Sequence, residues 1–460
     1  MLQLSLVLPS PPRAIARLSV MMKHGPRRPA VRPAMLDSAA AARQSPAMSS
    51  FPEPTTSHEH NTGAPAHIAP GSAAFLRTNL ALFAAGFATF ALLYSVQPLL
   101  PVFTSFFHVS PATSSLSLSA TTATLAVFML LASALSESFG RKPVMAASLL
   151  ASALLQLLSA AVPSWWELVG VRALMGVSLS GLPAVAMAYV SEEIEPRAIG
   201  LTMGLYIGGS GFGGMSGRLL AGILADHFGW RPAAAIIGAI GIVCGLVFAA
   251  SLPPSRHFRP RVLALGPLLG AYRAHLSDSG LPWLFAEGFL LMGGFVTIYN
   301  YIGYRLLAPP FSLSQAEVGL IFVVYLVGIF ASAWMGHLAA RVGRKRIFRA
   351  SLMIDLSGIV LTLSQNLGFV ILGIAVLTFG FFAAHSIASS WIGVRARHAR
   401  AQASALYLLL YYLGSSVVGS AGGFFWAAWG WQGVVGLTGT LLVLSLFAAQ
   451  RLARSNPEGE

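Results

Sequence analysis

The sequence predicts an all-α membrane protein whose twelve transmembrane helices form two six-helix bundles with pseudo-two-fold symmetry. Three observations lead to this prediction. Hydrophobic residues make up 55% of the 460 residues and charged residues 10%, whereas charged residues are about 25% of a soluble domain. From Asn79 onward, apolar stretches follow one another, each of the roughly 20 residues needed to cross the hydrocarbon core. The tripeptide Gly140-Arg141-Lys142 recurs as Gly343-Arg344-Lys345, which indicates an internal duplication.

The chain divides into a polar tail, two apolar halves and a linker. Residues 1–76 are rich in Pro, Ala, Ser and Arg and are expected to be disordered. The opening residues lack the basic region of a signal peptide, and Met22, Met35 and Met48 are all plausible starts. The remaining predicted parts are an N-terminal bundle at 77–252, a cytoplasmic linker at 253–280, a C-terminal bundle at 281–450 and a cytoplasmic tail at 451–460.

Each apolar stretch is expected to be a helix, because backbone groups in lipid must find their hydrogen bonds within the segment. The linker carries the run SRHFRPR and an amphipathic stretch around Ala271–Ser277. The predicted spans are 79–103, 114–136, 143–163, 166–190, 198–224 and 231–252, then 281–307, 314–340, 347–366, 368–393, 402–427 and 431–450.

Lysine and arginine placement predicts the orientation of these spans. With the amino terminus inside, the inner loops and the C-terminal tail carry most basic residues, and the outer ends carry only Arg231 and Arg305. This asymmetry predicts that both termini are cytoplasmic. The net charge of +14 does not indicate a nucleic-acid partner, because the basic residues lie between apolar segments and not on one face.

The duplication extends beyond the basic turns. Gly229-Trp230-Arg231 is matched by Gly430-Trp431-Gln432, and Leu205-Tyr206 by Leu406-Tyr407. Two similar membrane halves, each with a basic turn on one side, are typical of a secondary transporter. The single cysteine, Cys244, excludes a disulfide within the chain and a cysteine metal site, and we expect neither a metal nor a cofactor.

The basic turns carry a family resemblance. The stretch from Ser133 to Lys142, SALSESFGRK, resembles the loop motif G-x-L-x-D-R-x-G-R-K of the major facilitator superfamily, and GHLAARVGRK, ending at Lys345, is its second-half counterpart. The sequence differs from the motif at Ser133, at Glu137 in place of Asp, and at Ala340 in place of the second acid. Arg172-Ala-Leu-Met-Gly176 resembles the fourth-helix motif of this family, with Met where Gln is common.

Helix five resembles the antiporter motif G-x8-G-x3-G-P-x2-G, with Gly214 where the motif has proline, and Arg218 follows it. The matching residues are Gly200, Gly209, Gly213 and Gly217. Longer runs between Phe75 and Arg451 are similar to the arabinose-efflux-like group of facilitators. The resemblance implies the major facilitator fold and favours export. Small residues let helices approach closely in lipid. We therefore expect a set of glycines in helix five to pack against helix eight, across the interface between the halves: Gly208, Gly209, Gly211, Gly213, Gly214 and Gly217.

The two basic turns, Gly140-Arg141-Lys142 and Gly343-Arg344-Lys345, are predicted to gate transport. In the family, the acid at the position of Glu137 contacts the amino end of helix eleven, here near Gln402, where the helix dipole favours negative charge. Such a contact could latch the outward-facing state. The alternative is that both loops are basic because of their orientation alone. If the loops gate, the first should matter more, because Ala340 leaves the second without an acid.

Ionisable groups inside the membrane are candidates for proton coupling. Glu287 in helix seven shares a face with Gly294 and Tyr301, and a carboxyl group kept from water could load and release protons near neutral pH. The alternative for Glu287 is a structural pair with a cation of the linker or of a helix end. By the resemblance, Arg172 lies near the proton and substrate pathway; the alternative is a helix–helix hydrogen bond.

Two further charges lie within the predicted spans. Arg218 is expected to extend towards the outer surface or to pair with Asp226 or Glu317. Asp355, in helix nine, is expected to pair with a nearby basic residue, Arg346 or Arg349.

The resemblance also implies that helices one, four, seven and ten line a substrate cavity. Their polar and aromatic residues favour an uncharged or amphipathic organic solute held by stacking and a few hydrogen bonds, although Tyr is also common at membrane interfaces and in packing. The candidate cavity residues are Tyr94, Gln97, Asn300, Tyr301, Tyr304, His385 and Ser389.

These predictions combine into a secondary active transporter, and not an enzyme or a channel, because no catalytic set and no filter-like segment occurs. We expect a proton-coupled antiporter that exports sugar-like or drug-like small solutes across the inner membrane by alternating access. The alternative is proton-coupled uptake. The expected partners are membrane lipid, a small-molecule substrate and the proton, and the expected state is a monomer.

Overall fold

The structure is a computed structural model that describes residues 67–258 and 265–454. The described chain is helical, and its only β-bridge joins Ile68 to Ile194. Residues 67–76 do not belong to a tail as predicted: Ile68 exchanges backbone hydrogen bonds with Glu193 and Glu195, and the first helix begins at Ala73. The predictions for residues 1–66, for Arg259 and Arg261, and for residues 455–460 lie outside the described chain.

The first half contains the six predicted spans, several of them divided by prolines that lack a backbone donor. Pro98 separates the helix that begins at Ala73 from its continuation, and Pro183 begins a new helix after the break at Ser180–Leu182. The helical elements are α1 (Ala73–Tyr94), η1 (Gln97–Leu99), α2 (Leu100–Phe107), α3 (Pro111–Ser114), α4 (Leu116–Phe139), α5 (Arg141–Ala161), α6 (Trp165–Leu179), α7 (Pro183–Glu193), η2 (Pro196–Ala198), α8 (Ile199–Phe228) and α9 (Trp230–Ser251).

The second half repeats this order after one linker helix. Its last helix contains a break at Gly430 (φ 57°, ψ −142°), which separates the two final predicted spans. The elements are α10 (Leu265–Leu276) in the linker, then α11 (Leu281–Leu307), α12 (Gln315–Ile321), η3 (Phe322–Val324), α13 (Tyr325–Val342), α14 (Arg344–Leu361), α15 (Leu367–Arg395) and α16 (Arg400–Arg454).

Every predicted span coincides with a helical segment. Within the described chain, eight such segments are long and apolar enough to cross a membrane by length and composition, and one of these is α16, which contains two predicted spans. Three predicted spans do not meet these criteria for visible reasons: α6 and α7 are separate short helices, α8 is rich in glycine, and α14 begins with four basic residues in its first six.

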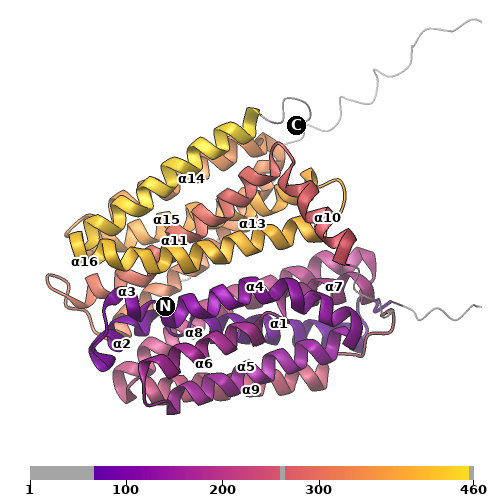
Figure 1. Ribbon diagram of the computed structural model, residues 1–460, viewed down its shortest axis with the longest axis horizontal. Helices are drawn as coiled ribbons and strands as arrows, with labels where there is room; N and C mark the ends of the chain where they lie inside the picture. The colour runs from indigo at the N-terminus through magenta and orange to yellow at the C-terminus, as the bar shows by residue number, and fades with distance from the viewer. Residues whose placement is uncertain (1–66, 259–264, 455–460) are drawn as a thin grey trace, which may run out of the picture. The chain divides into compact units, whose positions relative to one another are not determined.

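The helices of each half pack mainly on one another. In the first half, α1 packs on α8 and α9, α5 on α6 and α9, and α4 on α6; in the second, α11 and α14 both pack on α15 and α16. Figure 1 draws the helices of each half side by side. The halves meet where α4 contacts α16 and where α8 contacts α12 and α13. This is the two-bundle architecture that the sequence predicts.

The duplicated motifs mark equivalent backbone turns. Gly140 and Gly343, between α4 and α5 and between α13 and α14, have φ of 95° and 105°. Gly229 and Gly430, in the two Gly-Trp pairs, have φ of 84° and 57°. A side chain at such φ values collides with the backbone, so glycine is strongly preferred there. The repeat in the sequence therefore reports a repeat in backbone conformation.

The glycines of α8 confirm the packing prediction only at Gly211. A Cβ atom added to Gly209, Gly213 or Gly217 would lie 2.5, 2.0 and 2.6 Å from the backbone of α1, so these three residues allow close packing within the first half and not against helix eight. The eighth predicted span, formed by α12 and α13, is contacted by Gly211 against Ile329, as predicted, and also by Gly222 against Gly319.

We expect Gly213→Ala to destabilise the protein, because the new methyl group would lie 2.0 Å from the carbonyl oxygen of Phe87 and α8 would have to move away from α1. Overpacking of this kind costs about 1–3 kcal/mol. The matched control is Gly208→Ala on the same helix, where the added Cβ meets nothing within 4 Å. Thermal unfolding of the two purified variants in detergent makes the comparison; equal Tm values would contradict the packing described.

Candidate functional site

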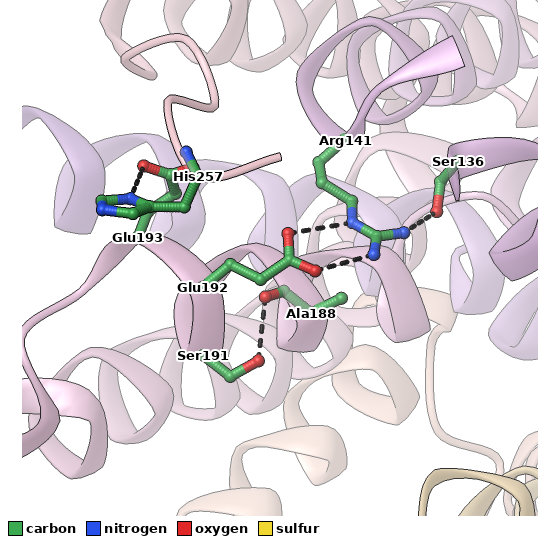
Figure 2. Close-up of polar contacts among 7 residues, drawn as sticks. All are labelled: Ser136, Arg141, Ala188, Ser191, Glu192, Glu193 and His257. Carbon is green, nitrogen blue, oxygen red and sulfur yellow. Dashed lines mark hydrogen bonds and ion pairs between the residues drawn. The ribbon is translucent and has the colours of Figure 1, made fainter. Parts of the chain in front are cut away.

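The turn between α4 and α5 is held by a bidentate ion pair. Arg141 donates from Nε to Oε2 of Glu192 at 3.2 Å and from Nη2 to Oε1 at 2.7 Å, and from Nη1 to Ser136 Oγ at 2.6 Å (Figure 2). Glu192 lies in the last turn of α7. Fork-to-fork pairs of this kind are strong and directional, so the first Gly-Arg-Lys turn is fixed to the end of α7.

The adjacent acid, Glu193, holds the linker. It accepts hydrogen bonds from the backbone N–H of His257 at 2.8 Å and from the His257 ring at 3.1 Å, as Figure 2 shows. His67 stacks on the His257 ring with centroids 4.3 Å apart. Neither Glu192 nor Glu193 was among the predicted site residues, although two consecutive acids at a helix end are a visible signal in a chain with only 15 acidic residues.

Glu137, the acid predicted to hold this turn, does not hold it in this conformation. Among the described residues, it forms no hydrogen bond and no ion pair with Arg141 or Gln402. Lys142 donates to the carbonyl oxygen of Leu252, at the start of the linker. In the second half, Arg344 is half-exposed and makes no ion pair with a described residue. The two turns therefore share backbone geometry, but their arginines differ: Arg141 has an ion pair and Arg344 has none with a described residue.

Arg172 is fully buried within the first half. It donates from Nε to the Ser117 carbonyl at 2.9 Å, from Nη1 to the Leu92 carbonyl at 3.1 Å and to Gln156 Oε1 at 3.2 Å, and from Nη2 to the Leu93 carbonyl at 2.7 Å. Leu92 and Leu93 precede the proline break that ends α1. This geometry corresponds to the helix–helix hydrogen-bonding alternative: Arg172 connects α6 to α1, α4 and α5.

The prediction for Arg218 was wrong. Its side chain does not extend to the surface, and it does not pair with Asp226 or Glu317. Its side chain is 2% exposed. The guanidinium lies over the rings of Tyr94, Tyr325 and Phe322, at 4.1, 4.7 and 5.4 Å from their centroids. Asp226 accepts instead from the backbone N–H of Gln315, and Glu317 closes a capping box at the start of α12. We call Tyr94, Phe322 and Tyr325 the aromatic cage of Arg218.

A series of buried hydrogen bonds links Arg218 to the second half. Arg218 donates from Nε to Gln97 Oε1 at 2.6 Å and from Nη1 to the Gly214 carbonyl at 2.7 Å. Gln97 Nε2 donates to Asn300 Oδ1 at 2.8 Å, and Asn300 Nδ2 donates to the Gly419 carbonyl at 3.4 Å. The structure thus brings together three predicted cavity residues, Tyr94, Gln97 and Asn300. They lie beside Arg218 or one hydrogen bond away from it, although Arg218 was not predicted to be a cavity residue.

The remaining cavity candidates separate into two groups. The Tyr304 hydroxyl lies 2.7 Å from Thr104 Oγ1 and so joins the two halves near the same series of hydrogen bonds, whereas Tyr301 donates to the Gly419 carbonyl at 2.8 Å within the second half. The His385 Nδ1 lies 2.8 Å from the Tyr407 hydroxyl, within the second half. Ser389 is exposed and bonds only to the Ser386 carbonyl.

Glu287 is fully buried, and no described residue supplies the cation that the structural alternative required. Its Oε2 accepts a hydrogen bond from the Ser445 hydroxyl, and its Oε1 has no hydrogen-bond partner among the described residues. Gly288 packs on the Tyr407 ring, so this acid lies close to the Tyr407–His385 pair. Asp355 is also buried and forms no ion pair with Arg346, Arg349 or another described residue, which corrects the expectation for it.

The hydrogen bonds between the two halves gather at one end of the bundles. Among the described residues they join 97–122 and 226 of the first half to 300–315 and 416–420 of the second. These residues lie at the far ends of their helices from the Gly-Arg-Lys turns, because α4 and α13 each run from this contact region towards a turn. We call the end of the bundles that holds Gly140–Lys142 and Gly343–Lys345 the GRK end. Hydrogen bonds join the bundles at the opposite end.

A cavity of about 510 Å³ lies at the GRK end, between the linker and α15. Its walls include Asp278 and Arg395, whose Oδ1 and Nε atoms are 2.6 Å apart. Burial alone would raise the pKa of Asp278, but hydrogen bonds from Arg395, Leu281 and Gly280 together with the Arg395 charge hold that pKa below its ordinary value. None of the predicted cavity residues lines this space.

Comparison with known proteins identifies the family. The sequence model of the Major Facilitator Superfamily matches residues 82–306 and 284–460. The chain belongs to this superfamily. It is 49% identical to an uncharacterized facilitator-type transporter, YybF of Bacillus subtilis, over 85% of this chain and 96% of the relative. It is 50% identical to the inner membrane transport protein YnfM of Escherichia coli over 84% of this chain and 93% of the relative. The family resemblance is confirmed, and the chain is a transporter and not an enzyme.

Solved structures confirm the fold. The crystal structure of a bacterial homolog of the human lysosomal transporter Spinster, in an inward-facing and occupied conformation, matches with a TM-score of 0.67 at 14% identity, over 82% of this chain and 96% of that one. A structure of the nucleoside transporter NupG matches with a TM-score of 0.68 at 16% identity, over 82% and 99%. The predicted major facilitator fold is therefore correct.

Proposed function

We propose that this facilitator is a proton-coupled antiporter that exports small organic solutes across the bacterial inner membrane. The observation that carries the proposal is Glu287, a buried acid in a membrane helix. One of its carboxylate oxygens accepts a hydrogen bond from the Ser445 hydroxyl, and the other has no hydrogen-bond partner among the described residues. A charge inside the membrane costs several kcal/mol unless it is compensated. Without a cation beside it, the carboxyl group of Glu287 is best suited to carry a proton in this conformation.

Release of that proton requires a change in surroundings, which alternating access provides. With the termini in the cytoplasm, as lysine and arginine placement predicts, the bundles are joined at the outer end and the conformation faces the cytoplasm. Rocking of the halves would break the outer hydrogen bonds, such as that of Gln97 with Asn300, and would change the packing of α11, which carries both Asn300 and Glu287. Proton loading and solute access would then be linked through one helix.

The test is substrate-stimulated proton flux in liposomes that contain the purified protein. Solutes are screened on the wild type, and the active ones are tested on Glu287→Gln, which keeps the side-chain shape and removes the titratable group. We expect the variant to retain solute exchange without a gradient and to lose gradient-driven transport.

The matched control is Asp355→Asn, which changes another buried acid that has no ion pair with a described residue and should retain proton coupling. Unchanged gradient-driven export by Glu287→Gln would refute the proton role, and gradient-driven accumulation in right-side-out vesicles would establish uptake.

A further inference from the structure

The guanidinium of Arg218 is a buried cation without a compensating acid. Its hydrogen-bond acceptors are an amide oxygen and a backbone carbonyl, and its other neighbours are the neutral rings of the aromatic cage. No acidic side chain forms an ion pair with it in the described chain. Buried charges in proteins are normally paired, so the positive charge at this place is an unusual feature.

Arg172 is the appropriate comparison, because it is equally buried and equally without an acid. All three of its nitrogens donate hydrogen bonds, and all their acceptors lie within the first half. Arg218 differs in two ways. Its Nη2 has no acceptor among the described residues, and part of its cage, Phe322 and Tyr325, belongs to the second half. Every nitrogen of the Arg172 guanidinium thus has an acceptor. Arg218 keeps one nitrogen without an acceptor among the described residues, and it lies at the interface between the halves, which separates during alternating access.

We propose that Arg218 binds the carboxylate of an anionic organic substrate. This inference rests on the proposed transport function and narrows its substrate class. A carboxylate can accept from Nη2 and neutralise the charge, and charge-assisted bonds to a guanidinium are among the strongest that a protein offers. The ring of Tyr94, which belongs to the same half as Arg218, would contact the organic part, and Gln97 supplies a further polar group next to the guanidinium.

The position of Arg218 also explains how such a site would be uncovered. Gln97, Tyr94 and Gly214 move with Arg218 because all belong to the first half, while Tyr325 and Phe322 belong to the second. Separation of the halves at this end would remove two ring faces and keep the hydrogen bonds to Gln97 and Gly214. The guanidinium would then be held in place, with its free nitrogen open to an anion on the outer side, where an exporter releases its solute and an uptake transporter binds it.

Binding can be tested without a proton gradient, so the result does not depend on Glu287. The full-length protein in neutral detergent is titrated with benzoate, salicylate and hexanoate, and with their uncharged amides, at constant pH and ionic strength, and the shift in Tm is measured. We expect at least one carboxylate to stabilise the wild type more than its amide does. If no carboxylate does so, the proposal is wrong, whatever the transport assay shows.

The decisive variant is Gln97→Glu, which places a carboxylate where Gln97 Oε1 accepts from Arg218 Nε. We expect the protein to stay folded and its apparent Kd for the active carboxylate to rise about tenfold or more, because the charge is already neutralised. The matched control, Gln156→Glu, makes the same change beside Arg172 and should leave binding unchanged. Wild-type affinity in Gln97→Glu, or equal loss in both variants, would overturn the assignment.

Discussion

Arg172→Met is expected to be the most destabilising single substitution in the first half. The methionine would fill much of the space but leave the carbonyls of Leu92, Leu93 and Ser117 without the donors they have now. Each buried carbonyl left without its donor costs about 1–3 kcal/mol, and this substitution leaves three of them. We therefore expect a large fall in Tm, or failure to accumulate in the membrane. Fluorescence-detected gel filtration after heating would measure the effect.

The control for this prediction is Arg231→Met, which removes one hydrogen bond, from Nη2 to the Val162 carbonyl at 2.8 Å. Its Tm should fall much less than that of Arg172→Met. If the two variants were equally stable, the hydrogen bonds of Arg172 would not be what holds α6 against α1, α4 and α5. A loss of transport without a loss of stability in Arg172→Met would instead favour the pathway role that the family resemblance implies.

Arg141→Ala is expected to reduce transport strongly, because it removes the bidentate pair that holds the first Gly-Arg-Lys turn to Glu192. Loss of a hydrogen-bonded charge pair of about 1.5–3 kcal/mol corresponds to a rate lower by roughly tenfold to a hundredfold if the pair is needed in the rate-limiting step. The readout is substrate-stimulated proton flux in liposomes, with protein folding checked by Tm.

The duplication supplies the matched control, Arg344→Ala, at the equivalent turn of the second half. Arg344 makes no ion pair with a described residue, so its loss should change flux only slightly. Similar losses in both variants would mean that the turns act through their positive charge alone, as orientation signals. A selective loss in Arg141→Ala would support the predicted asymmetry of the two turns, with Glu192 and not Glu137 as the acid that matters in this conformation.

The predicted features that the structure reproduces depend on local or repeated patterns. The spans follow from apolar length, and the paired turns follow from glycines that adopt positive φ at equivalent positions. Predictions about side-chain partners were less successful. Arg218 was expected at the surface because its depth in α8 is compatible with extension outwards, but the side chain turns inward to Gln97 and the aromatic cage. The partners of α8 also differed, because the sequence does not specify which helix its small residues approach.

The sequence by itself determined that this chain is a membrane protein of two similar helical halves, because the cost of placing backbone and charge in lipid restricts which segments can lie there. Only the tertiary structure decided which ionisable groups are saturated and which are not. Arg172 and Arg218 look alike in the sequence, each a lone cation in an apolar helix. Their difference arises from carbonyls, amides and rings contributed by helices far apart in the chain, and such contacts exist only after the bundles have packed.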